Sequence, residues 1–292
     1  MGTTQNVEID GTRVAYELIG EPGGRLWVVT PGGRFSKDSD GLRELATRLA
    51  AGGQLAVVWD RPNCGESDLR FTGPSESAMH ADALVGLVEH LDLGPAVLVG
   101  GSAGARTSLL AAQQRPDVVA GLGLVWLSGG VYGLMTLAGY YCAETLRAAW
   151  TEGMEAVAEL PEWSRTLARN PRNREALLGQ DRDEFIATME RWMAVYYPKD
   201  GESVPGLPES VARTITTPAL VFRSGQSDIN HPRATSESVA QLLPSARLVE
   251  PPWPDTEWND AQARMATGAQ RSPWSNWPKL APTLLDWADE LR

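Results

Sequence analysis

Short runs of consecutive apolar residues recur along the chain, and amphipathic segments separate them. Such runs are typical of strands that are buried on both faces of a parallel sheet. We predict strands of this kind at residues 26–29, 55–59, 96–99, 122–127, 219–222 and 246–249. Before them, residues 7–9 and 14–18 alternate between apolar and polar side chains around Asp10-Gly11, a pattern that predicts a β-hairpin with a glycine turn.

The segments between the apolar runs carry apolar residues at helical spacing. Residues 40–51 place leucines on one face and end at Gly52-Gly53, which can form a left-handed C-terminal cap. Residues 75–91 and 280–291 repeat this pattern. Strands and helices therefore alternate, which predicts an α/β fold with a mostly parallel eight-stranded sheet and helices on both faces.

One segment breaks the alternation. Residues 131–208 show no convincing strand but several amphipathic helices, rich in tryptophan and tyrosine. The segment lies between the sixth and seventh predicted strands. We therefore predict a core domain of residues 1–130 and 209–292 and a helical cap, or lid, of residues 131–208. Prolines and glycines in residues 198–208 mark the linker that returns to the core.

A candidate nucleophile follows the fifth predicted strand, in the sequence Gly100-Gly101-Ser102-Ala103-Gly104. A serine at G-x-S-x-G spacing, with a strand before it and a helix after it, is the pattern of a nucleophile elbow. This turn is strained, and a Cβ at the first or last glycine would collide with packed neighbours. The serine hydroxyl should then project above the edge of the sheet, at the positive end of a helix.

Composition and charge narrow the class of protein. The 292 residues are 42% hydrophobic, enough for a large core, and the net charge of −11 repels nucleic acids and anionic membranes. The chain has no run of about 18 apolar residues to span a bilayer, and its start lacks the basic and apolar regions of a signal peptide. We expect a cytoplasmic protein that binds neither nucleic acid nor membrane. A homodimer is compatible with the sequence, which does not fix the oligomeric state.

The cysteines and histidines point to no disulfide and no metal. Cys64 and Cys142 are too few for a disulfide framework and fit a reducing compartment. Cys64 lies in a turn with no base beside it, which favours a packed side chain over a second nucleophile. The three histidines lie too far apart for a local metal-ligand pattern. We therefore expect neither a metal nor a cofactor.

Four landmarks, in order, resemble the α/β-hydrolase superfamily over nearly the whole chain. Besides the elbow, residues 30–34 stand where that family has its His-Gly oxyanion loop. Residues 60–68 resemble its D-x-P-G-x-G-x-S turn, and residues 224–228 resemble the segment that ends in the triad acid. Many members also carry a cap after the sixth strand, where residues 131–208 stand. The resemblance implies the α/β-hydrolase fold and a serine nucleophile.

The chain departs from this family at the general base. The family's histidine lies in the loop after the eighth strand, but here residues 250–258 contain none, and no histidine follows His231. A serine hydroxyl is a poor nucleophile at neutral pH unless a base accepts its proton. The usual machinery is therefore either rebuilt from other residues or absent.

His231 is our first candidate for the base. It lies three residues after Asp228, in a loop that must open at the carboxyl edge of the sheet, where Ser102 also emerges. Asp228 stands at the family's acid position and would orient the imidazole. The alternatives are an ordinary loop or helix-capping histidine at position 231, and an aspartate at position 228 that caps its own turn.

Three other groups rank behind His231. His80 lies on the packed face of the helix predicted at residues 75–91, which favours a buried, hydrogen-bonded core histidine. Asp255 and Glu257 lie in the loop that carries the family's histidine. A carboxylate desolvated among the tryptophans of that loop would have a raised pKa and could transfer protons, the alternative being an ordinary solvated side chain.

The oxyanion and substrate sites have their own candidates. The backbone N–H groups of Gly33 and Ala103 are the expected oxyanion donors above Ser102. Arg34 can hold a substrate carboxylate, with a surface arginine as the alternative. Some aromatic residues should line an apolar pocket while others anchor the cap to the sheet. The candidates for substrate binding are Gly32, Arg34, Trp126, Tyr140, Trp192 and Trp253.

The sequence predicts a serine hydrolase of small hydrophobic esters or lactones. Ser102 would attack the carbonyl to form an acyl-enzyme, His231 would move the proton, and Asp228 would orient His231. Two other functions stay open because this scaffold hosts many reactions. One is a lyase, isomerase, cyclase or cofactor-free oxygenase in which Ser102 only donates a hydrogen bond. The other is a catalytically silent protein that holds a small hydrophobic ligand.

Overall fold

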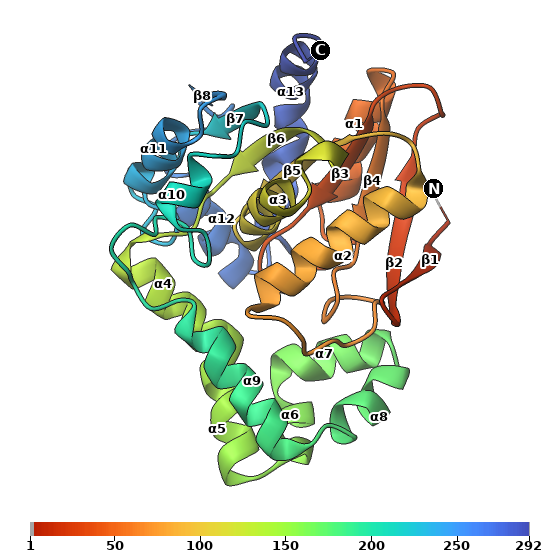
Figure 1. Ribbon diagram of the computed structural model, residues 1–292, viewed down its shortest axis with the longest axis vertical. Coiled ribbons are helices and arrows are strands. Elements are labelled where there is room, and N and C mark those ends of the chain that lie inside the picture. Colours follow the sequence, from red (N-terminus) through yellow and green to blue (C-terminus); the bar gives the residue numbers. More distant parts are fainter. Residues whose placement is uncertain (1–2, 292) are drawn as a thin grey trace.

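The computed structural model describes residues 3–291, which are built around one eight-stranded sheet (Figure 1). Its strands are β1 Gln5–Ile9, β2 Thr12–Ile19, β3 Leu26–Thr30, β4 Leu55–Trp59, β5 Ala96–Gly101, β6 Val119–Val125, β7 Ala219–Phe222 and β8 Ala246–Val249. Their order across the sheet is β1-β2-β4-β3-β5-β6-β7-β8. β2 pairs antiparallel with β1 and β4, and the remaining pairs are parallel. The predicted sheet is confirmed.

The strand predictions hold closely, with one displacement. β4, β7 and β8 occupy the predicted residues. The sixth strand, predicted at residues 122–127, instead runs from Val119 to Val125 because Val119 already pairs with Ala96 of β5. At its other end, Trp126 leaves the strand with a left-handed φ of 50°. This turn away from β6 brings Trp126 to the site described below.

Two apolar layers cover the two faces of the sheet, because successive side chains along a strand point to opposite faces. In β3, Leu26 and Val28 belong to one layer and Trp27 and Val29 to the other. The first layer contains α2 (Glu76–Leu91), α3 (Ala103–Gln114), α10 (Glu209–Ala212) and α11 (Arg233–Leu242). The second contains α1 (Leu42–Ala51), η3 (Pro273–Leu280) and α13 (Ala281–Ala288). Burial on both faces explains the continuous apolar runs in the sequence.

The helix ends follow local sequence signals. α2 begins after Ser75, whose hydroxyl accepts the N–H of Ala78, as expected of an N-cap serine. The helix predicted over residues 280–291 corresponds to α13, which is shorter, and η3 directly precedes it. Prolines lie inside η3 and at the start of α13. Two short elements complete the core: η1 (Pro116–Val118) and α12 (Glu257–Ala266). No helix within residues 3–291 is both long and apolar enough to cross a membrane.

Residues 130–208, the helical insertion, leave the sheet after β6 and return before β7. The insertion contains α4 (Gly130–Ala138), η2 (Gly139–Ala143), α5 (Glu144–Thr151), α6 (Met154–Glu159), α7 (Pro161–Arg169), α8 (Arg172–Leu178) and α9 (Arg182–Ala194). In Figure 1 it forms the lower part of the molecule, and α13 lies at the opposite end. Its own apolar cluster takes in Met79 of α2 and Ala103 of α3. The insertion therefore packs against the edge of the core that carries Ser102.

The outer glycines of the G-x-S-x-G motif allow a close approach of backbones, as the motif predicts. A Cβ at Gly100 would lie 2.3 Å from the carbonyl oxygen of Gly104. A Cβ at Gly104 would lie 2.1 Å from the carbonyl oxygen of Thr30 at the end of β3. Both contacts involve backbone atoms, which cannot rotate away as a side chain can.

We expect Gly104→Ala to lower the free energy of unfolding by about 1–3 kcal/mol, because the new methyl group forces β3 and α3 apart. Urea unfolding followed by circular dichroism measures the change. Gly139→Ala is the matched control, because Gly139 has a helical φ of −59° and no heavy atom within 4 Å of an added Cβ. That variant should gain about 0.5–1 kcal/mol. Equal stability of the two variants would contradict the packing argument.

Candidate active site

Ser102 lies at the sharp turn between β5 and α3. Its backbone has φ 54° and ψ −116°, a conformation that residues other than glycine rarely adopt. The turn is held from the neighbouring strand, because the Ser102 N–H lies 3.1 Å from the carbonyl oxygens of both Val125 and Trp126. The side chain is buried at the first turn of α3, where the helix dipole favours negative charge.

His231 contacts Ser102 from the loop between β7 and α11. Its Nε2 lies 3.0 Å from the Ser102 Oγ, and its Nδ1 lies 3.0 Å from Oδ2 of Asp228. The other carboxylate oxygen of Asp228 accepts the backbone N–H groups of Asn230 and His231 at 3.0 and 2.9 Å. If Nδ1 carries the proton and donates it to the carboxylate, Nε2 is free to accept from the serine hydroxyl. One carboxylate thus shapes the loop and orients the ring.

Aromatic rings fix the position of the imidazole. Trp126 lies roughly parallel to the His231 ring at a centroid distance of 6.4 Å, and Trp258 meets it edge-on at 4.3 Å. Trp258 follows β8, in the region where the family that this sequence resembles carries its histidine. In this chain that region supplies a wall beside the imidazole, while the imidazole itself comes from the preceding loop.

His80 lies apart from Ser102, as a buried residue of α2. Its Nε2 lies 2.8 Å from the carbonyl oxygen of Pro62, an arrangement in which the ring nitrogen donates. Burial lowers the pKa of His80 to about 3, although the nearby Glu76 carboxylate opposes this shift. His80 is therefore a neutral, hydrogen-bonded core histidine at ordinary pH.

The two carboxylates of the loop after β8 are engaged elsewhere. Asp255 pairs with Arg233 at 2.6 Å and is half-exposed. Glu257 is buried and accepts from Arg264 and from the Asn276 side chain, each at 2.7 Å. Neither carboxylate contacts Ser102 or His231.

The loop after β3 packs directly against the serine. A Cβ at Gly32 would lie 2.6 Å from the Ser102 Cβ, so only glycine permits this approach. The guanidinium Nη2 of the buried Arg61 lies 3.3, 2.8 and 3.3 Å from the carbonyl oxygens of Gly32, Gly33 and Phe35. The C=O and N–H of a trans peptide point in opposite directions. Anchoring the Gly32 carbonyl therefore turns the Gly33 N–H away from Arg61.

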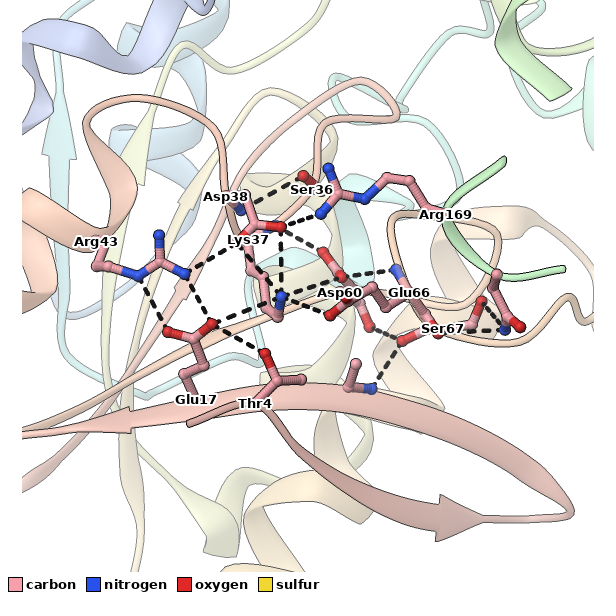
Figure 2. A network of polar contacts seen from close by, with 12 residues as sticks. Thr4, Glu17, Ser36, Lys37, Asp38, Arg43, Asp60, Glu66, Ser67 and Arg169 are labelled. Atoms are coloured by element: carbon pink, nitrogen blue, oxygen red, sulfur yellow. Dashed lines mark hydrogen bonds and ion pairs between the residues drawn. The ribbon is translucent and has the colours of Figure 1, made fainter. Parts of the chain in front are cut away.

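A partly buried network of charges contacts this loop (Figure 2). Asp60 accepts the backbone N–H of Lys37 at 2.6 Å, and burial raises the pKa of Asp60 to about 6. The ammonium of Lys37, itself buried, lies within 4 Å of four carboxylates: Glu66 (2.8 Å), Asp38 (3.4 Å), Glu17 (3.6 Å) and Asp60 (3.9 Å). Arg169 of α7 also pairs with Asp38. The network thus connects the loop after β3 to the sheet and to the insertion.

A cavity of about 400 Å³ opens beside Ser102 and His231. Its walls are mainly apolar and aromatic, and they include Phe35, Leu137, Tyr140, Tyr141, Trp258 and Trp274. Gly33 also lines it. A cavity of this size and lining fits a small hydrophobic ligand.

The expected substrate residues fall into two groups. Tyr140 lines the cavity, and Gly32 lies against the serine. Trp126 is buried behind the lining, with ring centroids 5.4 Å from Trp253 and 5.6 Å from Trp274. Trp126 and Trp253 therefore do not line the cavity as expected but belong to an aromatic cluster that supports its wall.

Two further expectations need correction. Trp192 does not line the cavity, because its ring fills the apolar cluster of the insertion and its Nε1 donates to the carbonyl oxygen of Gly73 at 3.3 Å. Arg34 is not a surface residue, and it does not line the serine cavity. Its buried guanidinium pairs with Glu76 at 3.4 Å and lies over the ring of Trp163. A buried cation needs such a partner.

Two residues in contact with the site escaped the sequence analysis. The hydroxyl of Ser128 lies 3.2 Å from the Ser102 Oγ, and it is buried at the end of the turn after β6. A polar residue directly after a buried strand was the available signal. Arg61, inside the turn after β4, gave the same signal. Both contacts depend on which strands are neighbours in the sheet.

Comparison with known proteins identifies the fold. The family model described as alpha/beta hydrolase fold matches residues 29–126, which run from β3 through the elbow to the turn after β6. The protein has the α/β-hydrolase fold. The fold predicted from the four landmarks is thereby confirmed.

Solved structures with this α/β-hydrolase fold superpose over most of the chain. An esterase from Thermogutta terrifontis does so with a TM-score of 0.60 and 20% identity, covering 98% of this chain and 99% of that one. An enol-lactonase from Burkholderia xenovorans LB400 gives 0.53 and 23%, covering 91% and 98%. The uncharacterized hydrolase YugF of Bacillus subtilis (strain 168) is 31% identical over 121 residues, which are 41% of this chain and 43% of that protein. The match thus spans less than half of that relative.

The lowered pKa of His80 predicts a pH dependence of stability in this α/β-hydrolase-fold protein. Below the ordinary histidine pKa of about 6.5, the His80 imidazole binds a proton in the unfolded chain, whereas in the folded chain it stays neutral down to about pH 3. The contribution of His80 to the free energy of unfolding is therefore full above pH 6.5, and it is lost progressively as the pH falls toward 3. In His80→Gln, a neutral side chain replaces the imidazole. The difference in free energy of unfolding between His80→Gln and wild type should therefore shift in favour of the variant by about 1.4 kcal/mol for each pH unit below 6.5.

Urea unfolding at pH 7, 6 and 5 measures this difference. The raised pKa of Asp60 acts in the opposite direction between about pH 4 and 6, but it is common to both proteins and cancels in the comparison. His90→Gln, which alters an exposed histidine at the far end of α2, is the matched control and should follow wild type. If the difference in free energy of unfolding between wild type and His80→Gln is the same at all three pH values, folding does not lower the pKa of His80.

Proposed function

We propose that this protein is a serine hydrolase of small hydrophobic esters or lactones. The observation that carries the proposal is the continuous chain of contacts from Ser102 Oγ through His231 to Asp228, with both distances at 3.0 Å and all three side chains buried. This is the geometry by which a base accepts a hydroxyl proton and a carboxylate stabilises the resulting imidazolium.

The reaction follows from this arrangement. The Ser102 oxygen bonds to the substrate carbonyl carbon while His231 accepts the hydroxyl proton. The carbon–oxygen bond to the leaving alcohol then breaks, and His231 returns the proton to that alcohol. Water, deprotonated by the same imidazole, hydrolyses the acyl-serine and restores the hydroxyl. For a lactone, the leaving alcohol stays attached to the acyl group.

The oxyanion would be held by the N–H groups of Gly33 and Ala103. Ala103 is the first residue of α3, so its N–H lies at the positive end of the helix. Arg61 orients the Gly33 peptide from the opposite side. Each such donor contributes roughly 3 kcal/mol to the stability of a tetrahedral transition state.

The substrate class rests on the cavity and on the structural neighbours. The volume of about 400 Å³ and the aromatic lining favour a small hydrophobic acyl compound. An esterase and an enol-lactonase, which share the fold over more than nine-tenths of this chain, lend support to hydrolysis of an ester or a lactone.

The first experiment combines a fluorophosphonate probe with hydrolysis of p-nitrophenyl butyrate. We expect wild type to be labelled at Ser102, located by peptide mass spectrometry, and to hydrolyse the ester. Ser102→Ala should do neither, and His231→Gln should lose about 10³-fold or more in kcat/KM. His90→Gln, far from the cavity, should behave as wild type.

Different failures point to different conclusions. Labelling of His231→Gln at the wild-type rate would remove His231 as the base. Binding of hydrophobic ligands without labelling or turnover would favour the silent binding protein. Conversion of a ligand without an acyl-enzyme would favour a non-hydrolytic enzyme.

We expect Arg61→Met to lower kcat about 10- to 100-fold, with little change in KM. Asp60 still holds the loop at Lys37, but the Gly33 N–H loses the fixed direction that Arg61 gives it. A boronic acid that forms a tetrahedral adduct with Ser102 should lose affinity in the same proportion. Arg106→Met is the control, because Arg106 is equally buried but contacts Ser77 and Tyr196 instead of the loop. If both variants lower kcat alike, Arg61 acts only on general stability.

A further inference from the structure

A second cavity, of about 190 Å³, adjoins the one at Ser102. The two cavities share three lining residues: Phe35, Tyr140 and Arg165. The second cavity lies between the loop after β3, which contributes Ser36 and Ser39, and helix α7 of the insertion. The two cavities therefore lie side by side, with Phe35, Tyr140 and Arg165 at their border.

The chemical character differs between the two cavities. The cavity at Ser102 is mainly apolar, whereas the second is lined by hydroxyl groups and by three arginines against one carboxylate. The charged residues are Arg34, Arg165, Arg169 and Glu162, and the hydroxyl-bearing ones are Ser36, Ser39, Thr166 and Tyr140. In a chain with a net charge of −11, this lining is opposite in sign to the molecule as a whole.

The three arginines are not equivalent. Arg34 is neutralised by Glu76, and Arg169 by Asp38. Arg165 has no ion-pair partner within residues 3–291, and its one hydrogen bond there runs from Nε to the carbonyl oxygen of Pro161 at 2.9 Å. Its two terminal nitrogens thus remain available. A guanidinium presents these nitrogens in a fork that matches a carboxylate.

We propose that the second cavity binds a carboxylate at the far end of the substrate, with Arg165 as its principal contact. The inference rests on the proposed function and narrows it: the preferred substrate is an ester whose apolar segment spans the aromatic cavity and ends in an anionic group. Phe35 and Tyr140, which border both cavities, would hold the apolar segment where it passes between them.

The test compares mono-p-nitrophenyl suberate with its methyl ester, which has the same chain but no charge. We expect wild type to prefer the charged ester about tenfold in kcat/KM. In Arg165→Gln the ratio should fall to about one, and in Arg165→Glu below one, because the new carboxylate repels the substrate. Arg147→Gln is the matched control: it removes the same charge from an exposed arginine of the insertion that lines neither cavity. Its ratio should equal that of wild type.

A binding measurement tests the inference without turnover. In Ser102→Ala, monomethyl suberate should bind about tenfold more tightly than dimethyl suberate by calorimetry, and added salt should reduce the difference because it screens the exposed guanidinium. Equal affinities, or a preference that persists in Ser102→Ala with Arg165→Gln, would overturn the inference. Hydrolysis of the neutral ester by wild type reports on the proposed function alone, so its failure is distinguished from failure of the carboxylate site.

Discussion

Close contact between backbones at the carboxyl edge of the sheet is the constraint on which the site depends. The turn at Ser102 packs against the end of β3 through Gly104, and the loop after β3 packs against Ser102 through Gly32. These contacts leave no room for a Cβ at either glycine. Because the strained serine backbone is held by Val125 of the neighbouring strand and by Trp126 in the turn that follows it, the direction of the Ser102 Cα–Cβ bond is fixed.

His231 contacts Ser102 from the loop after β7, whereas the region after β8 contains no histidine. Asp228 and His231 are separated by two residues, and the carboxylate accepts the backbone N–H of His231 and lies 3.0 Å from its ring Nδ1. A short turn thus supplies both groups of the contact chain. The region after β8 contributes Trp258, which packs edge-on against the ring. Aromatic packing there limits the rotation of the imidazole.

The charge network around the loop after β3 helps to fix the position of that loop beside Ser102. A lysine as buried as Lys37 would be costly if it were unpaired, but four carboxylates surround it. Asp60 in turn fixes the backbone at Lys37, and Arg61, the next residue, fixes three carbonyls of the same loop. Two consecutive residues therefore set the position of a loop on which Ser102 depends.

The sequence by itself determined the features that arise from nearby residues. Continuous apolar runs predicted six of the eight strands, because burial of both faces demands them, and alternation around Asp10-Gly11 predicted the other two. The glycines around Ser102 predicted the strained turn. The pairing of Asp228 with His231 was within reach because only two residues separate them. Tertiary structure alone decided which distant groups meet. Ser128 reaches Ser102 because β6 lies beside β5, Arg61 reaches the glycine loop because β4 lies beside β3, and Trp192 fills the insertion because helices enclose it. Such contacts depend on strand order and helix packing, which local periodicity does not encode.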